Sequence, residues 1–292
     1  MESEPHSPLS REISGRIEVV IGNGGLAKVV ARSDGGVAEV YLHGAHVAHF
    51  QRGDEAPLLF LSRQSRFEKG KAIRGGIPVI FPWFGARDGS PMHGTARIRE
   101  WDFLGGTFKN GIVRLHFKLP SASESFPPYA VDYVVEVSDK LKLELTVLNR
   151  GAQPFQFESC LHTYFLVAEI DSVDVRGLEG LGYQDKMDSF AHKIDPDPLL
   201  RIDRETDRVY FDTTGTIEII DKEFARIIRI EKTGSASTVL WNPWTDKSAK
   251  MEDFGADEFR HMVCVESGNV GQNQVTLASG ESSKMTVQLS IG

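Results

Sequence analysis

Two stretches of the sequence each place one proton-carrying side chain inside an otherwise apolar, strand-like run. His162 lies in SCLHTYF, and Glu266 lies much further along the chain in VCVESGNV. Histidine titrates near neutral pH and can donate or accept a proton, whereas a carboxylate that is ionised at pH 7 can only accept one. One of each suits a reaction in which one proton leaves the substrate as another is delivered.

Either residue alone would be weak evidence for a reaction. A single histidine in an apolar run is usually a hydrogen-bonded core residue, and a single glutamate there is usually half of an ion pair. The hypothesis of an acid–base site therefore depends on His162 and Glu266 converging in one cleft.

Each proton carrier is preceded by a cysteine two positions earlier, Cys160 before His162 and Cys264 before Glu266. Residues two apart on a strand share a face of the sheet. We therefore expect both thiols to be reduced and buried beneath the same cleft, close enough together to affect catalysis when modified. Free cysteine behaves as a small hydrophobe, and neither thiol has the surroundings of a nucleophile.

The net charge of −8 argues against binding to nucleic acid or to an anionic membrane surface. Within residues 60–99, however, basic residues outnumber acidic ones by eight to two. This basic region would attract a small anionic ligand. Most of its side chains are expected to be solvated, but Arg74 and Arg97 lie in turn sequences between apolar runs, and His93 in MHGTAR is a further candidate for ligand contact.

Three histidines in YLHGAHVAHF, at positions 43, 46 and 49, raise the question of a metal site. On a strand, the first and third share a face and the second points away, while on a helix steps of three drift around the cylinder. No CxxC or HExxH motif accompanies them. We expect neither a metal nor another cofactor.

The secondary-structure pattern predicts an all-β fold with few short helices. Leu141–Val147 alternates between apolar and polar residues, as a half-buried strand does. Asn110-Gly111 and Ser138–Lys140 each separate two such runs, which indicates hairpins. Further strands are expected at 17–21, 27–32, 37–42, 216–220, 225–231, 239–241 and 285–291, and a single helical turn around 255–259. Many short strands predict a large antiparallel sandwich in one domain, residues 16–292.

Residues 1–15 are polar and acidic, so we expect a disordered tail and not a targeting segment. The most apolar run, Ile77–Gly85, is too short to cross a bilayer. Two cysteines in 292 residues do not form a disulfide framework, which favours a reducing compartment. A cytoplasmic, monomeric protein is expected.

Six motifs taken together resemble the glucose-6-phosphate 1-epimerases, or hexose-6-phosphate mutarotases, within the aldose 1-epimerase family. They are RGGIPVIFPWFG, HGTARIREW, LHTYF, ETDRVY, WNPWTDKS and VCVESGNV, in this order. The resemblance covers the chain from about Ile17 to its C-terminus. It implies a galactose-mutarotase-like β-supersandwich that interconverts the α and β anomers of glucose 6-phosphate, with the sugar in a groove on one broad sheet.

The same resemblance implies roles for particular residues. His162 and Glu266 would be the catalytic pair, while Arg74, Arg97 and Asp207 would contact the sugar phosphate with His93 beside them. One position departs from the family pattern. The family often has a glutamine directly before the HG dipeptide, and this chain has Met92, which offers no side-chain amide.

Two other functions compete with this one. A mutarotase for unphosphorylated aldoses would have no need of the basic region. A carbohydrate-binding module could stack sugars on Trp83, Trp241 and Trp244, but binding alone would not require both His162 and Glu266. A glycoside hydrolase is disfavoured because no second carboxylate is placed to pair with Glu266.

Overall fold

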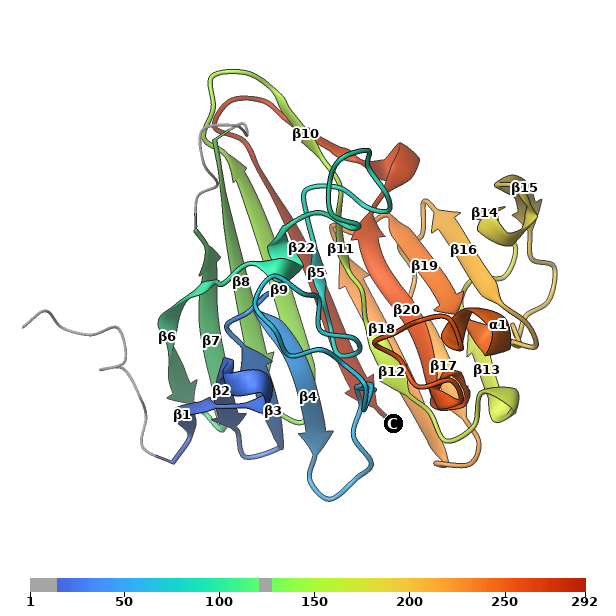
Figure 1. The fold of residues 1–292 in the computed structure, drawn as a ribbon, viewed down its shortest axis with the longest axis horizontal. Coiled ribbons are helices and arrows are strands. Elements are labelled where there is room, and N and C mark those ends of the chain that lie inside the picture. The colour runs from blue at the N-terminus through green and yellow to red at the C-terminus, as the bar shows by residue number, and fades with distance from the viewer. Residues whose placement is uncertain (1–14, 121–127) are drawn as a thin grey trace, which may run out of the picture.

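The computed structural model describes residues 15–120 and 128–292 and consists mainly of antiparallel β-strands (Figure 1). The predicted tail, residues 1–15, lies outside the described residues except for Gly15. Two sheets of eight strands each face one another, with smaller sheets at their margins. This arrangement confirms the antiparallel all-β sandwich that the sequence pattern predicts.

One of the large sheets, here called the backing sheet, contains the longest strands. Its order is β13 (Val173–Arg176), β17 (Ile217–Asp221), β18 (Arg226–Thr233), β22 (Ser282–Ile291), β9 (Leu141–Asn149), β8 (Tyr129–Val137), β7 (Ile112–Leu119) and β6 (Asp102–Lys109).

The second large sheet, here called the site sheet, carries both proton carriers. Its order is β15 (Ala191–Ile194), β14 (Gly182–Asp185), β16 (Thr206–Phe211), β19 (Ser237–Asn242), β20 (Met262–Asn269), β11 (Ser159–Leu161) and β5 (Val79–Ile80). The short strand β12 (Tyr164–Leu166) continues beyond β11 and also pairs with β20.

Smaller elements complete the fold. Four strands form a separate sheet, β1 (Ile17–Ile21), β2 (Ala27–Arg32), β3 (Gly36–Tyr41) and β4 (His46–Arg52), and β10 (Phe155–Phe157) pairs with β21 (Val275–Leu277). The described helices are α1 (Trp244–Ser248) and the 3₁₀ turns Asn23–Gly25, Ala96–Ile98, Ile170–Ser172, Lys186–Asp188, Glu258–His261 and Gly271–Asn273.

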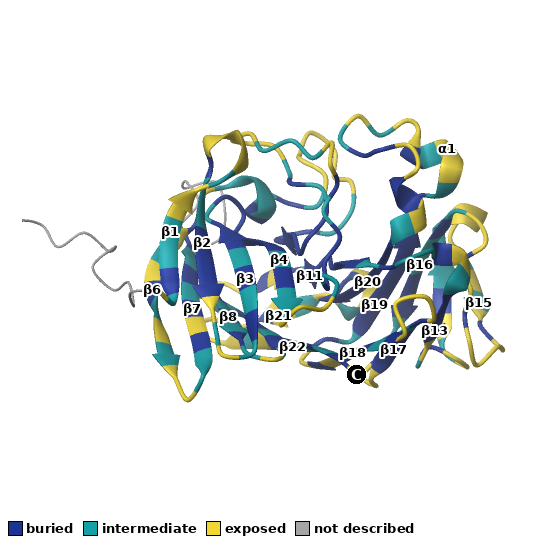
Figure 2. Cartoon of the chain, turned by 90° about the horizontal axis from the view of Figure 1, so that it is seen from below, coloured by how far each residue is buried: buried dark blue, intermediate teal, exposed yellow. Residues whose placement is uncertain are grey.

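Alternation in the sequence accounts for the strands of the backing sheet. Along β8 and β9 apolar side chains recur at every second position and are buried, while most of the intervening polar ones are partly exposed. The predicted hairpin between β6 and β7 turns at Asn110 and Gly111, with φ of 53° and 78°. Both dihedrals are positive, as a two-residue hairpin turn requires. Figure 2 shows the buried stretches concentrated between the two layers.

Two short helices differ from what the sequence predicts. The helical turn expected around 255–259 is a 3₁₀ turn displaced to Glu258–His261, and α1 was not predicted, because a five-residue helix is too short to show periodicity. The sequence left the conformation of the histidine-rich segment open. In the structure His43 precedes β4 and bonds the carbonyl oxygen of Lys71 at 2.7 Å, whereas His46 begins β4.

No helix in the described part of the chain combines the length and the apolar character that a membrane crossing requires.

Candidate functional site

A cavity of about 630 Å³ opens on the site sheet. All six residues that the sequence singled out line it, together with residues that were not predicted. The lining includes Arg74, Phe84, Met92, His93, Arg97, His162, Tyr164, Lys186, Phe190, Asp207, Val239, Trp241, Lys247, Met251 and Glu266.

The strand register brings His162 and Glu266 together. β11 pairs with β20 as far as Ser267, and β12 pairs with β20 from Cys264 onward, with the same register on both sides. His162, between the two short strands, therefore lies opposite Glu266, and Val239 is paired with Glu266 on its other side. Side chains directly opposite on neighbouring strands share a face and lie in contact distance. His162, Glu266 and Val239 form one row of residues paired across neighbouring strands.

A second such row on the same face of the site sheet crosses four strands. Tyr164 is paired with Cys264, which is paired on its other side with Trp241. Trp241 is in turn paired with Asp207 on β16. Lys186 follows β14 directly, and its ammonium group lies 3.0 Å from the Asp207 carboxylate. The sheet thus places an aromatic floor and an ion pair one row away from the acid–base pair.

The row on the other side of the pair holds Cys160. This residue is opposite Gly268, where a side chain would come within 2.9 Å of the Cys160 sulfur, so only glycine fits. The thiol lies 3.5 Å from Oε2 of Glu266. Strand parity therefore correctly predicted that each cysteine shares a face with its neighbour. The two buried thiols lie in rows on either side of the His162–Glu266 row, not side by side.

His162 and Glu266 form a buried pair whose Nε2 and Oε1 atoms are 3.2 Å apart. Burial raises the pKa of Glu266 to about 8, while the charge of Lys186 opposes the rise. Burial, followed by the neighbouring His93 and Arg97, holds the pKa of His162 well below its ordinary value. Burial therefore favours a protonated Glu266 and a neutral His162 in the ligand-free protein, whereas from the sequence we took the carboxylate as ionised at pH 7.

His93 lies at the cavity wall in a tight turn. Its φ is 63°, and the following Gly94, at 75°, continues the turn. The Nδ1 atom accepts a hydrogen bond from the backbone N–H of Gly85 at 3.1 Å, and the ring lies 5.7 Å from that of His162, centroid to centroid. Burial and the charge of Arg97 lower the pKa of His93 to about 3, so the imidazole is neutral and can donate a hydrogen bond to a ligand.

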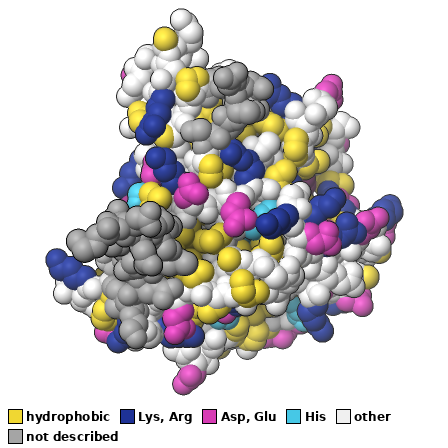
Figure 3. Space-filling model, turned by 60° about the vertical axis from the view of Figure 1, so that its left-hand side comes forward, with side chains coloured by type: hydrophobic (Ala, Val, Ile, Leu, Met, Phe, Trp, Pro, Cys, Tyr) yellow, Lys and Arg dark blue, Asp and Glu magenta, His cyan; other side chains and the backbone are white. Residues whose placement is uncertain are grey.

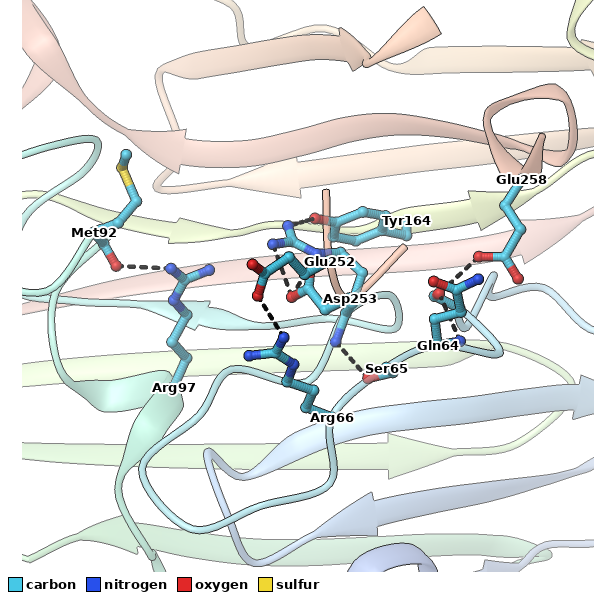
Figure 4. Close-up of polar contacts among 11 residues, drawn as sticks. Gln64, Ser65, Arg66, Met92, Arg97, Tyr164, Glu252, Asp253 and Glu258 are labelled. Atoms are coloured by element: carbon cyan, nitrogen blue, oxygen red, sulfur yellow. Dashed lines mark hydrogen bonds and ion pairs between the residues drawn. The ribbon is translucent and has the colours of Figure 1, made fainter. Parts of the chain in front are cut away.

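Arg74 is engaged on two sides. Its Nε and Nη2 donate to Asp253 at 3.3 and 3.1 Å, and Nη1 donates to the hydroxyl of Tyr164 at 3.0 Å. Figure 4 shows the neighbouring pair of Arg66 with Glu252, which are 2.6 Å apart.

Three of the eight basic residues of this region, Arg63, Arg66 and Arg74, thus pair with acidic residues of segment 252–258. No local pattern in the sequence indicates this pairing, because Arg74 and Asp253 are 179 positions apart. On the face drawn in Figure 3, basic and acidic side chains likewise lie close together.

Arg97 is the exception among the four basic side chains that line the cavity. Lys186 and Lys247 have carboxylate partners in Asp207 and Glu205, but Arg97 forms no ion pair with any described residue. Its Nη2 donates to the carbonyl oxygen of Met92 at 2.7 Å (Figure 4), and its Nε is buried without a hydrogen-bond partner. Burial lowers the pKa of Arg97 to about 10, so it stays charged at pH 7.

The charged residues Lys186, Lys247 and Asp253 belong to the site or its supports, and the sequence did not single them out. Lys186 lies in a surface hairpin and Asp253 in a loop, where charged residues are ordinarily solvated. Only the fold brings one to Asp207 and the other to Arg74. Met92, which stands where the family often has glutamine, lines the cavity with an exposed side chain and contributes its backbone oxygen to Arg97.

A second cavity, of about 450 Å³, lies beside β4 and has a more apolar lining. Two carboxylates, Glu39 and Glu258, and two histidines line it. Glu39 accepts a hydrogen bond from Lys28, and Glu258 accepts hydrogen bonds from the Ser62 hydroxyl and two backbone N–H groups. The cavity on the site sheet is the candidate active site, because there a histidine and a carboxyl group are both buried and lie 3.2 Å apart.

The sequence profile of the aldose 1-epimerase family matches residues 28–290. A protein of Cenchrus ciliaris provisionally named a glucose-6-phosphate 1-epimerase is 33% identical over 288 residues, which is 94% of this chain and 87% of that protein. One from Escherichia coli K12 with the same provisional name is 33% identical over 241 residues, 81% of each chain.

Solved structures show the same fold. A provisionally assigned mutarotase from Salmonella typhimurium superposes with a TM-score of 0.89 at 27% identity, covering 97% of this chain and 95% of that one. A galactose mutarotase-like protein from Clostridium acetobutylicum gives a TM-score of 0.75 at 16% identity, covering 94% and 98%. The second likeness supports the fold alone.

Proposed function

This chain belongs to the aldose 1-epimerase family, and we propose that its substrate is a hexose 6-phosphate, whose α and β anomers it interconverts. The names of its relatives point to glucose 6-phosphate. The observation that carries the proposal is Arg97, which lines the cavity that holds the acid–base pair. Its side chain is half-buried, it has no carboxylate partner among the described residues, and its Nε is buried and unsatisfied.

Anomer exchange requires two proton transfers. A base removes the proton of the C1 hydroxyl while an acid protonates the ring oxygen, the ring opens, and C1 rotates about its bond to C2. Reversal of both transfers then closes the ring on the other face. Glu266 as the base and His162 as the acid, 3.2 Å apart, can serve both ends of this exchange.

Substrate binding would change the electrostatic surroundings of the pair. Arg97 and Arg74 both lower the pKa of His162 in the ligand-free protein, and Arg97 also lowers that of Glu266. A dianionic phosphate bound to Arg97 would offset these charges and raise both pKa values, so His162 would hold a proton more readily and could act as the acid. The phosphate would then contribute to the chemical step as well as to binding.

The remaining lining residues have roles that fit a phosphorylated sugar. Arg97 offers fork-shaped donors to phosphate oxygens, and Arg74 has further N–H groups beyond those bound to Asp253. Asp207 would accept hydrogen bonds from sugar hydroxyls, with Lys186 holding its carboxylate in place. His93 would donate to the sugar beside them.

The structure also bears on the alternative of a carbohydrate-binding surface. Trp83 and Trp241 are only 6% and 8% exposed, and the indole N–H of Trp83 donates to the carbonyl oxygen of Pro91. These rings line or support the cavity and do not form an open stacking face. We propose in addition that the protein acts in the cytoplasm without a cofactor, in keeping with two free thiols.

Exchange NMR of equilibrated anomers tests the proposal. Glucose 6-phosphate anomers should exchange faster with protein present than without it, and the acceleration should exceed that for glucose under the same conditions. Equal acceleration of both sugars would favour a mutarotase for unphosphorylated aldoses, and no acceleration of either would contradict the proposed function.

A further inference from the structure

Three side chains with metal-binding donor atoms converge at the floor of the cavity. A ring nitrogen of His162, the sulfur of Cys264 and a carboxylate oxygen of Glu266 all lie within 4.8 Å of one another, and all three residues are buried. The site sheet fixes this arrangement, because Cys264 and Glu266 are alternate residues of β20 and His162 lies opposite Glu266. Nitrogen, thiolate and carboxylate are the donors that Zn²⁺ takes in proteins.

The distances suit a tetrahedral ion. Bonds of about 2.0–2.3 Å to Zn²⁺ place its ligand atoms roughly 3.3–3.7 Å apart. The His162 and Glu266 atoms are already 3.2 Å apart. The sulfur of Cys264, at no more than 4.8 Å from either, needs a movement on the order of 1 Å to complete the triangle. The fourth position would face the cavity, where a water molecule or a sugar hydroxyl can enter.

The charges of the cavity permit a cation. Arg74 is paired with Asp253 and Lys186 is paired with Asp207, so each of these positive charges is already offset. Among the four basic side chains that line the cavity, Arg97 is the one without a carboxylate partner in the described chain. A divalent ion would therefore meet one uncompensated positive charge and gain two anionic ligands.

We propose that His162, Cys264 and Glu266 form an inhibitory site for a divalent cation of the zinc type. On binding, the Cys264 thiol and the His162–Glu266 pair each release one proton to solvent, and the ion takes the lone pairs that the protons occupied. Exchange stops while the ion is bound, because neither proton carrier is free. Only this inhibitory effect rests on the proposed function; the binding site itself does not.

Cobalt(II) is the probe, because a cobalt–thiolate bond has a charge-transfer absorption that reports sulfur ligation without any assay of activity. The intact protein should develop this band on titration with Co²⁺ and lose it when Zn²⁺ is added. Cys264→Ser should abolish the band, whereas Cys160→Ser should retain it, because Cys160 also approaches Glu266 but lies outside the triad. Absence of the band in the wild-type protein, or its persistence in Cys264→Ser, would overturn the proposal.

Inhibition provides the second measurement. Zn²⁺ should slow anomer exchange reversibly, with recovery on adding a chelator, and Cys264→Ser should need at least about tenfold more Zn²⁺ for the same effect, roughly 1.4 kcal/mol. If Cys264→Ser does not fold, Glu266→Gln replaces it in the cobalt titration and should weaken binding. Equal sensitivity of wild type and Cys264→Ser to Zn²⁺ would contradict the site. A cobalt band in a protein without exchange activity would contradict only the proposed function.

Discussion

His162 and Glu266 are neighbours across the site sheet, with Nε2 and Oε1 3.2 Å apart, although 103 residues separate them in the chain. Their environment keeps one proton between them, because burial opposes the charged form of each group. A pair that holds one proton can give it to one oxygen of a sugar and accept another from a second oxygen.

Glu266→Gln and His162→Ala should each slow anomer exchange by about 10²–10⁴-fold, since each removes one of the two proton carriers. Exchange NMR measures the rate, and circular dichroism with thermal unfolding shows whether the fold persists. A well-folded Glu266→Gln variant with nearly wild-type exchange would rule out the mechanism.

Arg97→Ala should weaken the binding of glucose 6-phosphate much more than that of glucose, because Arg97 is the one basic side chain of the cavity without a carboxylate partner among the described residues. A charge-assisted hydrogen bond contributes roughly 1.5–3 kcal/mol, or about ten- to hundredfold in affinity. KM for both sugars measures the effect, and high salt should reproduce part of it.

Arg66→Ala is the matched control for Arg97→Ala. Arg66 belongs to the same basic region, but it pairs with Glu252 and does not line the cavity. It should leave KM for glucose 6-phosphate nearly unchanged. Equal losses for glucose and glucose 6-phosphate in Arg97→Ala would show that Arg97 supports the fold and does not bind the phosphate.

The pH profile of kcat/KM should fall as the pH rises through about 8, where the pair of the free enzyme loses its proton from Glu266. The acidic limb reflects a second proton entering the pair, at a pH well below the ordinary pKa of histidine. In the pH profile of kcat, the acidic limb should lie at higher pH for glucose 6-phosphate than for glucose. The bound phosphate would offset the positive charge of Arg97, which lowers the pKa of His162 in the ligand-free protein. An activity that keeps rising above pH 9 would contradict the assignment.

Cys160→Ser should lower the free energy of unfolding by about 1–3 kcal/mol and change substrate affinity less, since it replaces a soft thiol packed among Ile80, Val209 and Val239 with a polar hydroxyl. Cys160 is fully buried, and burial raises the pKa of its thiol well above the ordinary value. Thiol reagents should therefore react slowly with the native protein, and bound sugar phosphate should slow them further. Fast labelling that the ligand does not affect would contradict this burial.

In the His46→Leu variant, the free energy of unfolding should fall less steeply as the pH is lowered below neutrality. His46 is 1% exposed, and burial lowers its pKa from an ordinary value near 6.5 to about 3. Between these values the unfolded chain binds one more proton, so stability falls as the pH falls, by about 1.4 kcal/mol per pH unit. Urea unfolding at several pH values from 7.5 to 4 gives the free energy of unfolding at each pH. Its change per pH unit should be smaller by this amount in the variant. An unchanged slope would mean that His46 is protonated in the native state.

The sequence alone determined the fold class and most strand positions, and it singled out six of the residues that line the cavity. Alternation over Leu141–Val147 and the turn at Asn110-Gly111 are local signals, because side-chain direction and turn dihedrals depend on a few neighbouring residues. Because residues two apart on a strand share a face, the sequence likewise placed each cysteine on the same face as the proton carrier that follows it.

The tertiary structure decided what depends on contacts between distant segments. The pairing of Arg74 with Asp253, the unpaired state of Arg97 and the approach of Lys186 to Asp207 each join parts of the chain that no local pattern relates. The protonation state of Glu266 also required the fold, because its pKa is set by how completely neighbouring strands exclude water. The residue types for the chemistry can be read in sequence, but their charges and partners depend on packing.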